Sequence, residues 1–174
     1  LNQLNIYLSN LEHNYKFLKR NLNSSTNLIA VVKASAYGSA LPAITKRLEK
    51  LGVNTFAVAY SNEGKILRRN GIKSRIMVFY PQPYELDDII DNKLEACLYS
   101  VNILKKFHEK LILRKLRNFP VHIKYNTGLN RLGFKPSCFE WIINQLKDDT
   151  FTLKSIYSHL AVSQAKSCLL YTSP

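Results

Sequence analysis

Apolar positions along the chain follow two alternating patterns. Short runs rich in branched residues are typical of buried strands, and longer stretches with an apolar residue every three or four positions are typical of amphipathic helices. The sequence predicts strands at 27–34, 54–60, 75–80, 94–99, 120–125 and 153–159. Helical patterns lie between these runs, for example at 41–52 and 137–147.

Helix boundaries are indicated by short local motifs. Ser9 with Glu12, and Ser137 with Glu140, match the S-x-x-E capping box and predict helix starts. Two glycines occupy positions where helices are expected to end: Gly52 and Gly71. Strands joined by helices require crossover connections, so we expect a parallel α/β sheet. Both a doubly wound sheet and a (β/α) barrel fit this rhythm.

Composition adds few constraints. The chain has 174 residues, with 46% hydrophobic and 21% charged residues, which is ordinary for a globular domain. No uncharged run approaches the length needed to span a bilayer. The three cysteines are widely spaced, at Cys97, Cys138 and Cys168. Without a C-x-x-C pair they support neither a metal site nor a disulfide framework, and a reducing, cytoplasmic setting is the simpler expectation.

The formal net charge of +13 raises the question of an anionic partner. The densest basic stretch is 105–117, and apolar residues recur there at helical spacing: Ile103, Leu104, Phe107, Leu111 and Leu113. We therefore expect the basic residues to form the solvated face of a helix. Binding of nucleic acid or another polyanion through this helix is the non-enzymatic alternative.

Polar residues stand at or just after the predicted strand ends. Lys33 follows the first apolar run, Lys124 closes the fifth, and His159 closes the sixth. Arg131 lies in the loop after the fifth run. Since the carboxyl ends of parallel strands face one way, we expect these four residues to share a catalytic rim.

The residue types limit the chemistry. Glu63 and Glu95 belong to a helix start and a strand start, so no acid pair is expected at the rim. The serines lack a G-x-S-x-G elbow. A lysine in a partly apolar pocket can form a Schiff base with a carbonyl, which leaves a Schiff-base aldolase or a pyridoxal phosphate enzyme. Spacing does not choose between them.

Four segments resemble one known family. The stretch AVVKASAYGSA (30–40) resembles the pyridoxal phosphate attachment motif of the alanine racemases. The segments 56–81, HIKYNTGLNRLGF (122–134) and SHLA (158–161) are similar to further segments of that family, in the same order. The resemblance implies a (β/α)8 TIM-type barrel of which about six strands are present. We expect a partial barrel domain over 1–165 and a non-native tail over 166–174.

The resemblance implies a role for each matched residue. Lys33 would hold the cofactor as a Schiff base and act as the base on one face of the substrate. Tyr37 would lie beside the cofactor and its phosphate. Arg131 would hydrogen-bond the phenolic oxygen and contribute to substrate binding, and His159 would rest against the pyridine ring.

Supporting residues follow from the same match, with some departures. Lys124 matches a lysine that is carbamylated in many members and helps to orient the arginine. Asn126 replaces the usual aspartate, Leu129 the usual methionine and Ser35 the usual asparagine. The loss of a carboxylate at Asn126 changes the charge balance near Lys124 and Arg131, although an amide still forms hydrogen bonds.

The resemblance also implies a biological setting. It predicts a cytoplasmic homodimer that interconverts L- and D-alanine for peptidoglycan precursors, without nucleic-acid or membrane partners. The opposite-face tyrosine and a β-rich domain would lie beyond these residues, so the chain alone is expected to be inactive. A single-domain pyridoxal phosphate carrier or another amino-acid racemase is the alternative within the same fold.

Overall fold

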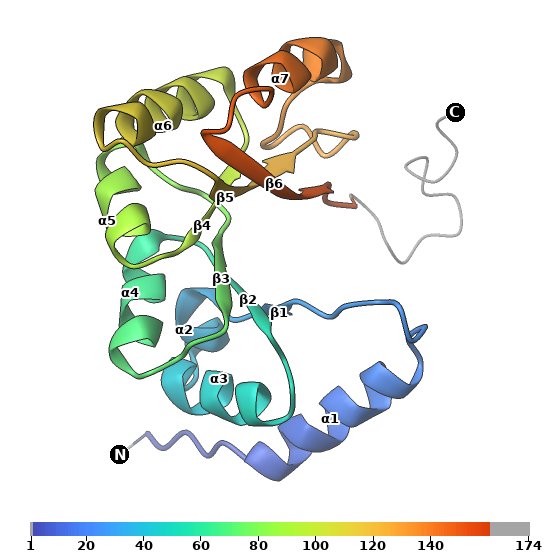
Figure 1. The fold of residues 1–174 in the computed structure, drawn as a ribbon. Coiled ribbons are helices and arrows are strands. Elements are labelled where there is room, and N and C mark those ends of the chain that lie inside the picture. Colours follow the sequence, from blue (N-terminus) through green and yellow to red (C-terminus); the bar gives the residue numbers. More distant parts are fainter. Residues whose placement is uncertain (1, 161–174) are drawn as a thin grey trace. The chain divides into compact units, whose positions relative to one another are not determined.

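The computed structural model describes residues 2–160. The chain divides into two compact units, each with its own strands and helices (Figure 1). Unit 1 comprises Leu1–Tyr80 and Asp87–Leu94, and unit 2 comprises Pro81–Leu86 and Glu95–Pro174. The tail expected at 166–174, together with Cys168, lies outside the described residues.

Unit 1 is built on three parallel strands. They are β1 (Ala30–Val31), β2 (Thr55–Val58) and β3 (Arg75–Val78). Its helices are α1 (Leu8–Arg20), α2 (Lys33–Gly38), α3 (Leu41–Lys50), α4 (Ser61–Arg69) and most of α5 (Leu86–Asp91). The register aligns Val31 with Ala57 and Ala57 with Met77. All four residues of β2 are buried, which explains why this strand has a continuous apolar sequence without alternation.

Unit 2 has the same construction. Its strands are β4 (Glu95–Leu98), β5 (Phe119–Lys124) and β6 (Phe151–Tyr157), and its helices are α6 (Val101–Leu113) and α7 (Phe139–Gln145), with short 3₁₀ turns at η1 (Pro83–Glu85) and η2 (Pro136–Cys138). The strands pair in parallel, with His122 aligned to Ser155 and Lys124 to Tyr157. Phe107 of α6 stacks edge-on against Phe119, 5.3 Å between ring centroids, and anchors the core of this unit.

The strand and helix pattern of the sequence is confirmed. Each of the six predicted runs overlaps a strand that pairs in parallel with a chain neighbour inside the same unit, although β5 and β6 begin one and two residues before the predicted runs. The ends after α3 and α4 are confirmed as well. The amide of Val53 donates to the Leu48 carbonyl (3.0 Å), and Ile72 donates to Leu67 (3.1 Å), in the Schellman pattern around Gly52 and Gly71.

Both predicted capping boxes are wrong. Ser9 lies inside α1, and Glu12 instead forms ion pairs with Lys16 and Arg47. Ser137 lies within η2, so the chain has already turned before α7 begins and the serine cannot cap it.

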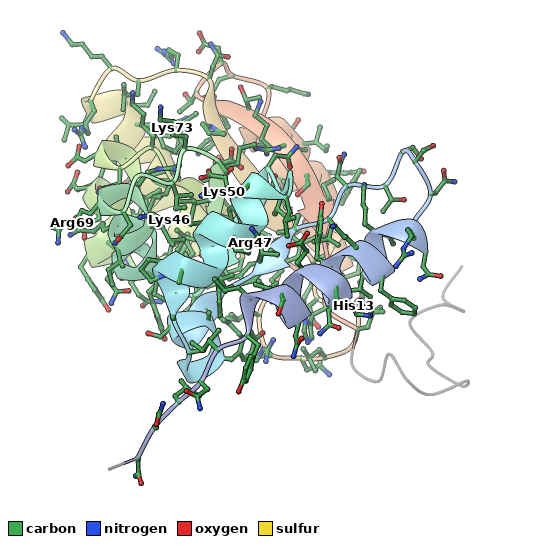
Figure 2. The ribbon with its side chains drawn as sticks, turned by 90° about the horizontal axis from the view of Figure 1, so that it is seen from below. His13, Lys46, Arg47, Lys50, Arg69 and Lys73 are labelled. Carbon is green, nitrogen blue, oxygen red and sulfur yellow. The ribbon has the colours of Figure 1, made fainter. Side chains whose placement is uncertain are left out.

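Basic side chains lie mainly on the outer faces of helices. In α6 the apolar side, including Ile103 and Phe107, is buried while Lys105 and Lys106 are exposed, as expected. Leu113 departs from the predicted apolar face, because it lies at the helix end and is 81% exposed. Figure 2 shows six basic side chains of unit 1: His13, Lys46, Arg47, Lys50, Arg69 and Lys73. Among residues 2–160, no helix is both long and apolar enough to cross a membrane.

Candidate functional site

Lys33 stands just beyond the carboxyl end of β1. The amide of Val32 still donates to the Ala57 carbonyl of β2 (2.8 Å), and the chain leaves the sheet at the next residue. The lysine side chain is half-buried. Within the described part of the chain its amine makes no hydrogen bond and no ion pair. An amine held at a strand end without a partner is available to react with a carbonyl group.

The residues that follow Lys33 form a left-handed turn. Ala34, Ser35, Ala36 and Tyr37 have φ between 52° and 58° and ψ between 44° and 51°. L-residues avoid this conformation because Cβ crowds the following carbonyl, at a cost of roughly 1–2 kcal/mol per residue, and it normally occurs one residue at a time. Backbone strain of this kind is concentrated at functional sites. The sequence did not indicate the turn, since none of the four residues is glycine.

A buried carboxylate ties this turn to the neighbouring strand end. Glu63 Oε1 accepts a hydrogen bond from the Ser35 amide (3.3 Å). Glu63 Oε2 accepts one from the Ala59 amide (2.8 Å) and a longer one from Tyr60 (3.4 Å), just after β2. Glu63 is 9% exposed. Sequence reasoning placed this residue at a helix start, which is correct, but gave it no part in the site.

Tyr37 is the last residue of the left-handed turn. Its side chain is 69% exposed, so the phenol projects from the turn into solvent. Lys33 and Tyr37 therefore stand at the two ends of one strained segment of unit 1.

Lys124 ends β5 in unit 2 and is buried, 7% exposed. Its ammonium lies 5.7 Å from the centroid of the Tyr157 ring, within range of a cation–π contact. Burial raises the pKa of the Cys97 thiol to about 12, although a hydrogen bond with Tyr157 and the charge of Lys124 lower it. Burial likewise raises the pKa of Tyr157. The two groups beside Lys124, the Cys97 thiol and the Tyr157 phenol, therefore stay neutral at physiological pH.

The loop after β5 is organised by Asn126. Its Oδ1 accepts hydrogen bonds from the amides of Gly128 (3.2 Å) and Asn130 (2.9 Å). The backbone closes the loop, because the Asn126 amide donates to Phe134 (2.9 Å) and the Phe134 amide donates to Lys124 (2.8 Å). The amide oxygen of Asn126 therefore accepts two backbone hydrogen bonds, although it carries no charge.

The other two predicted site residues of unit 2 lie on exposed loops. Arg131 is exposed in the loop that Asn126 organises. His159 is exposed and follows β6 by two residues, because this strand ends at Tyr157. The predicted residues thus form two groups that the structure describes separately, one in each unit. Unit 1 holds Lys33 and Tyr37, and unit 2 holds the remainder: Lys124, Asn126, Arg131 and His159.

A buried hydrogen-bonded chain in unit 2 was missed. Glu95 Oε2 lies 2.8 Å from His122 Nε2, and His122 Nδ1 lies 2.7 Å from Ser155 Oγ. The order resembles a hydrolase triad, but His122 is 2% exposed and Ser155 lies within a strand. Because the histidine is buried and the three residues lie on neighbouring strands, we assign the chain to the packing of β4, β5 and β6. The two-residue spacing of His122 and Lys124 on one strand is the signal that could have placed them on the same face.

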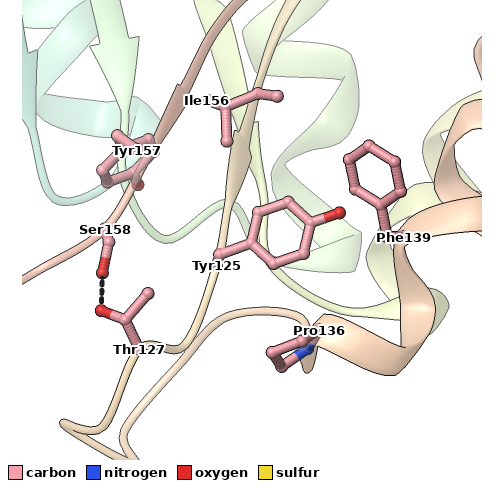
Figure 3. A pocket seen from close by; sticks show the side chains of 7 residues that line it. All are labelled: Tyr125, Thr127, Pro136, Phe139, Ile156, Tyr157 and Ser158. Atoms are coloured by element: carbon pink, nitrogen blue, oxygen red, sulfur yellow. Dashed lines mark hydrogen bonds between the residues drawn. The ribbon is translucent and has the colours of Figure 1, made fainter. Parts of the chain in front are cut away.

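An apolar pocket of about 550 Å³ opens beside the ends of β5 and β6 (Figure 3). The rings of Tyr125 and Phe139 face it, and a hydrogen bond joins Thr127 to Ser158 at its side. The remaining lining residues are Pro136, Ile156 and Tyr157. None of the predicted site residues lines this pocket, and it has no charged side chain, so it is not assigned to catalysis.

Comparison with known proteins places these features in a family. The model of the alanine racemase N-terminal domain matches residues 6–172. Alanine racemase 1 of Caldanaerobacter subterraneus subsp. tengcongensis is 33% identical over 164 residues, which cover 92% of this chain and 42% of the relative. The serine/alanine racemase of Enterococcus gallinarum is 31% identical over 151 residues, covering 86% of this chain and 21% of the relative.

The solved structures agree. Alanine racemase from Clostridium difficile 630 superposes with a TM-score of 0.84 at 32% identity, covering 89% of this chain and 41% of that structure. This likeness decides between the two fold classes that the sequence left open, in favour of a partial TIM barrel. The chain spans less than half the length of these relatives. Because the matched region covers nearly the whole chain, the protein belongs to the alanine racemase family and carries the N-terminal domain of that family.

Proposed function

We propose that the protein is a pyridoxal phosphate-dependent alanine racemase that interconverts L- and D-alanine. The observation that carries this proposal is Lys33, unpartnered among the described residues, at the head of a left-handed turn in the segment that resembles the family's cofactor-attachment motif. The proposal extends the family assignment from the domain to the reaction of the whole protein.

The residues present suit this cofactor chemically. Pyridoxal phosphate has an aldehyde, a phosphate and a phenolic oxygen, so its site needs an amine together with cations and hydrogen-bond donors. Lys33 offers the amine, and Tyr37 a phenol for the phosphate. Arg131 and His159 offer donors for the phenolic oxygen and the ring, respectively.

The proposed reaction assigns one proton transfer to Lys33. When bound, the cofactor withdraws electrons from the α-carbon of the amino acid and so makes its proton removable. Lys33 Nζ then accepts or delivers that proton on one face. Racemisation needs a second acid–base group on the opposite face, which we assign to a tyrosine of a partner subunit in a homodimer.

Lys124 and Asn126 support the site without touching the reacting atoms. Asn126 shapes the loop that carries Arg131, and Lys124 lies at the start of that loop. We propose that Lys124 orients Arg131 and thereby holds the phenolic oxygen of the cofactor. A carbamylated lysine would perform this task as an anion.

Alanine is the proposed substrate because it is named in all three of the relatives described above. D-alanine would supply peptidoglycan precursors, and the protein would act in the cytoplasm. Another amino-acid racemase, such as one acting on serine, is the nearest alternative, and the name of the Enterococcus gallinarum relative favours testing it.

A chiral assay of the protein expressed from its complete reading frame tests the proposal. The wild type with pyridoxal phosphate should convert L-alanine into D-alanine, and Lys33→Ala should reduce the rate by roughly 10⁴-fold or more, since it removes both the attachment point and one base. Conversion of L-serine but not L-alanine would identify another racemase. Cofactor binding without racemisation of either would identify a carrier.

A further inference from the structure

We propose that Glu63 is a positioning residue for Lys33: its carboxylate holds the left-handed turn that fixes the lysine at the end of β1. This inference rests on the proposed function for its catalytic meaning. The claim that Glu63 holds the turn depends only on hydrogen bonds within unit 1.

The left-handed turn must be stabilised by residues outside it. Four consecutive non-glycine residues adopt positive φ directly after Lys33, a conformation that an isolated segment abandons. Strained segments of this kind persist only where the surrounding structure determines them. Among the hydrogen bonds of residues 2–160, the turn is tied to another element through Glu63. The side chain of Glu63, in α4, accepts a hydrogen bond from the backbone amide of Ser35.

The carboxylate bridges two segments of unit 1. One oxygen of Glu63 accepts from Ser35, and the other accepts from Ala59 just after β2. An ionised carboxylate is an acceptor at both oxygens, and its charge strengthens both bonds. The turn is therefore tied to the end of a buried strand, and Lys33, two residues before Ser35, is fixed with it.

A helix-capping role alone does not account for this geometry. Glu63 lies in the first turn of α4, and its bond to Tyr60 resembles a capping box. That bond is the longest of the three, 3.4 Å, and it uses the oxygen that also binds Ala59. The bond from Ser35 plays no part in capping α4, because Ser35 belongs to a different segment.

Glu63→Gln is the decisive variant. The amide keeps the size of the side chain but offers only one acceptor oxygen, so one of the two backbone donors faces an NH₂ group. Glu49→Gln is the matched control, since Glu49 Oε1 also accepts two backbone amides of unit 1, from Lys73 (3.0 Å) and Ser74 (2.9 Å), away from the turn.

The first measurement is hydrogen–deuterium exchange without cofactor, on the protein from the complete reading frame. Glu63→Gln should raise the exchange rate of the peptide covering 33–38 by about tenfold, and Glu49→Gln should leave that peptide unchanged. Unchanged exchange of 33–38 in Glu63→Gln would overturn the proposal. Equal acceleration in both variants would mean general loosening and would also overturn it.

The second measurement is pyridoxal phosphate affinity, followed by absorption of the lysine adduct and by borohydride trapping on Lys33. Glu63→Gln should weaken binding about tenfold, while Glu49→Gln binds as the wild type does. Wild-type affinity in Glu63→Gln, despite faster exchange, would overturn the positioning role. Failure of the wild type to give any adduct at Lys33 would instead overturn the proposed function, with the exchange result still deciding whether Glu63 holds the turn.

Discussion

Gly133 closes the loop that carries Arg131, and no other residue fits its place. Its φ is +123°, and a Cβ there would lie 2.6 Å from the Asn126 nitrogen and the Tyr125 carbonyl carbon. Both are backbone atoms that the loop's own hydrogen bonds hold in place. The loop geometry at residue 133 thus depends on the absence of a side chain.

Gly133→Ala should lower the free energy of unfolding by about 2 kcal/mol or more, because it adds a clash to an unfavourable φ. Gly38→Ala is the control, since Gly38 also has positive φ (+80°) but nothing lies within 4 Å of its added Cβ. Urea unfolding should show a smaller loss there, about 1 kcal/mol. Equal losses in the two variants would contradict the account of Gly133.

The buried chain of Glu95, His122 and Ser155 makes a stability prediction. Glu95→Ala removes the carboxylate that pairs with the buried His122 Nε2. We therefore expect the free energy of unfolding to fall by about 3 kcal/mol. Adding His122→Leu to Glu95→Ala should recover part of that loss, because it removes the unsatisfied ring nitrogen. Chemical denaturation of the single and double variants provides the test, and a double variant less stable than Glu95→Ala would contradict it.

Cys97 makes the fold sensitive to alkali. Burial raises the pKa of the native thiol from 9.0 to about 12, so above pH 9 the unfolded chain loses a proton that the native protein keeps. This contribution to stability is complete below pH 9 and is lost as the pH rises toward 12. The stability advantage of the wild type over Cys97→Ala should therefore shrink by about 1.4 kcal/mol per pH unit above pH 9. An advantage independent of pH between 8.5 and about 10.5 would contradict this.

At the scale of elements, the left-handed turn of α2 inverts the usual effect of glycine. Ala34 has φ 52° and is exposed, so replacing it with glycine removes strain without removing buried surface. Ala34→Gly should raise the melting temperature or leave it unchanged. Ala43 is also exposed but lies in the right-handed helix α3. Ala43→Gly should therefore lower the free energy of unfolding by about 1 kcal/mol. A loss at Ala34 as large as that at Ala43 would show that the turn is not left-handed.

The elements themselves could be predicted because their signals are local and repeated. Buried parallel strands have continuous apolar sequences, and α6 shows its buried stripe directly in the spacing of Ile103 and Phe107. The predictions from the capping motif failed because a pattern of only four positions, S-x-x-E, often occurs by chance. Ser100 does cap α6, since it accepts a hydrogen bond from the Ile103 amide (3.3 Å), but it is not followed by a glutamate at the third position. The turn after Lys33 could not be predicted, because none of its four residues is glycine and the Ser35 amide bonds to Glu63, 28 positions further along the chain.

The site shows the same division between local and distant causes. The strand pattern placed Lys33 and Lys124 at strand ends. In the structure Lys33 lies two residues beyond β1, and Lys124 is the last residue of β5. The hydrogen bonds of Glu63 to the turn and of His122 to Glu95 were not predicted, because they join residues far apart in the chain. Hydrogen bonds of this kind leave no periodic trace in a sequence.

At the scale of the whole molecule, the residues of the proposed cofactor site are divided between the two units. Lys33 and Tyr37 belong to unit 1, and Arg131 and His159 belong to unit 2. The relatives are more than twice as long as this chain.

The most direct test is borohydride reduction of the protein from its complete reading frame after incubation with pyridoxal phosphate, followed by peptide mass spectrometry. The reduced adduct should map to Lys33 in the peptide that contains 30–40 and should be absent from Lys33→Ala. An adduct at another lysine, with Lys33 unmodified and racemisation intact in Lys33→Ala, would contradict the central claim.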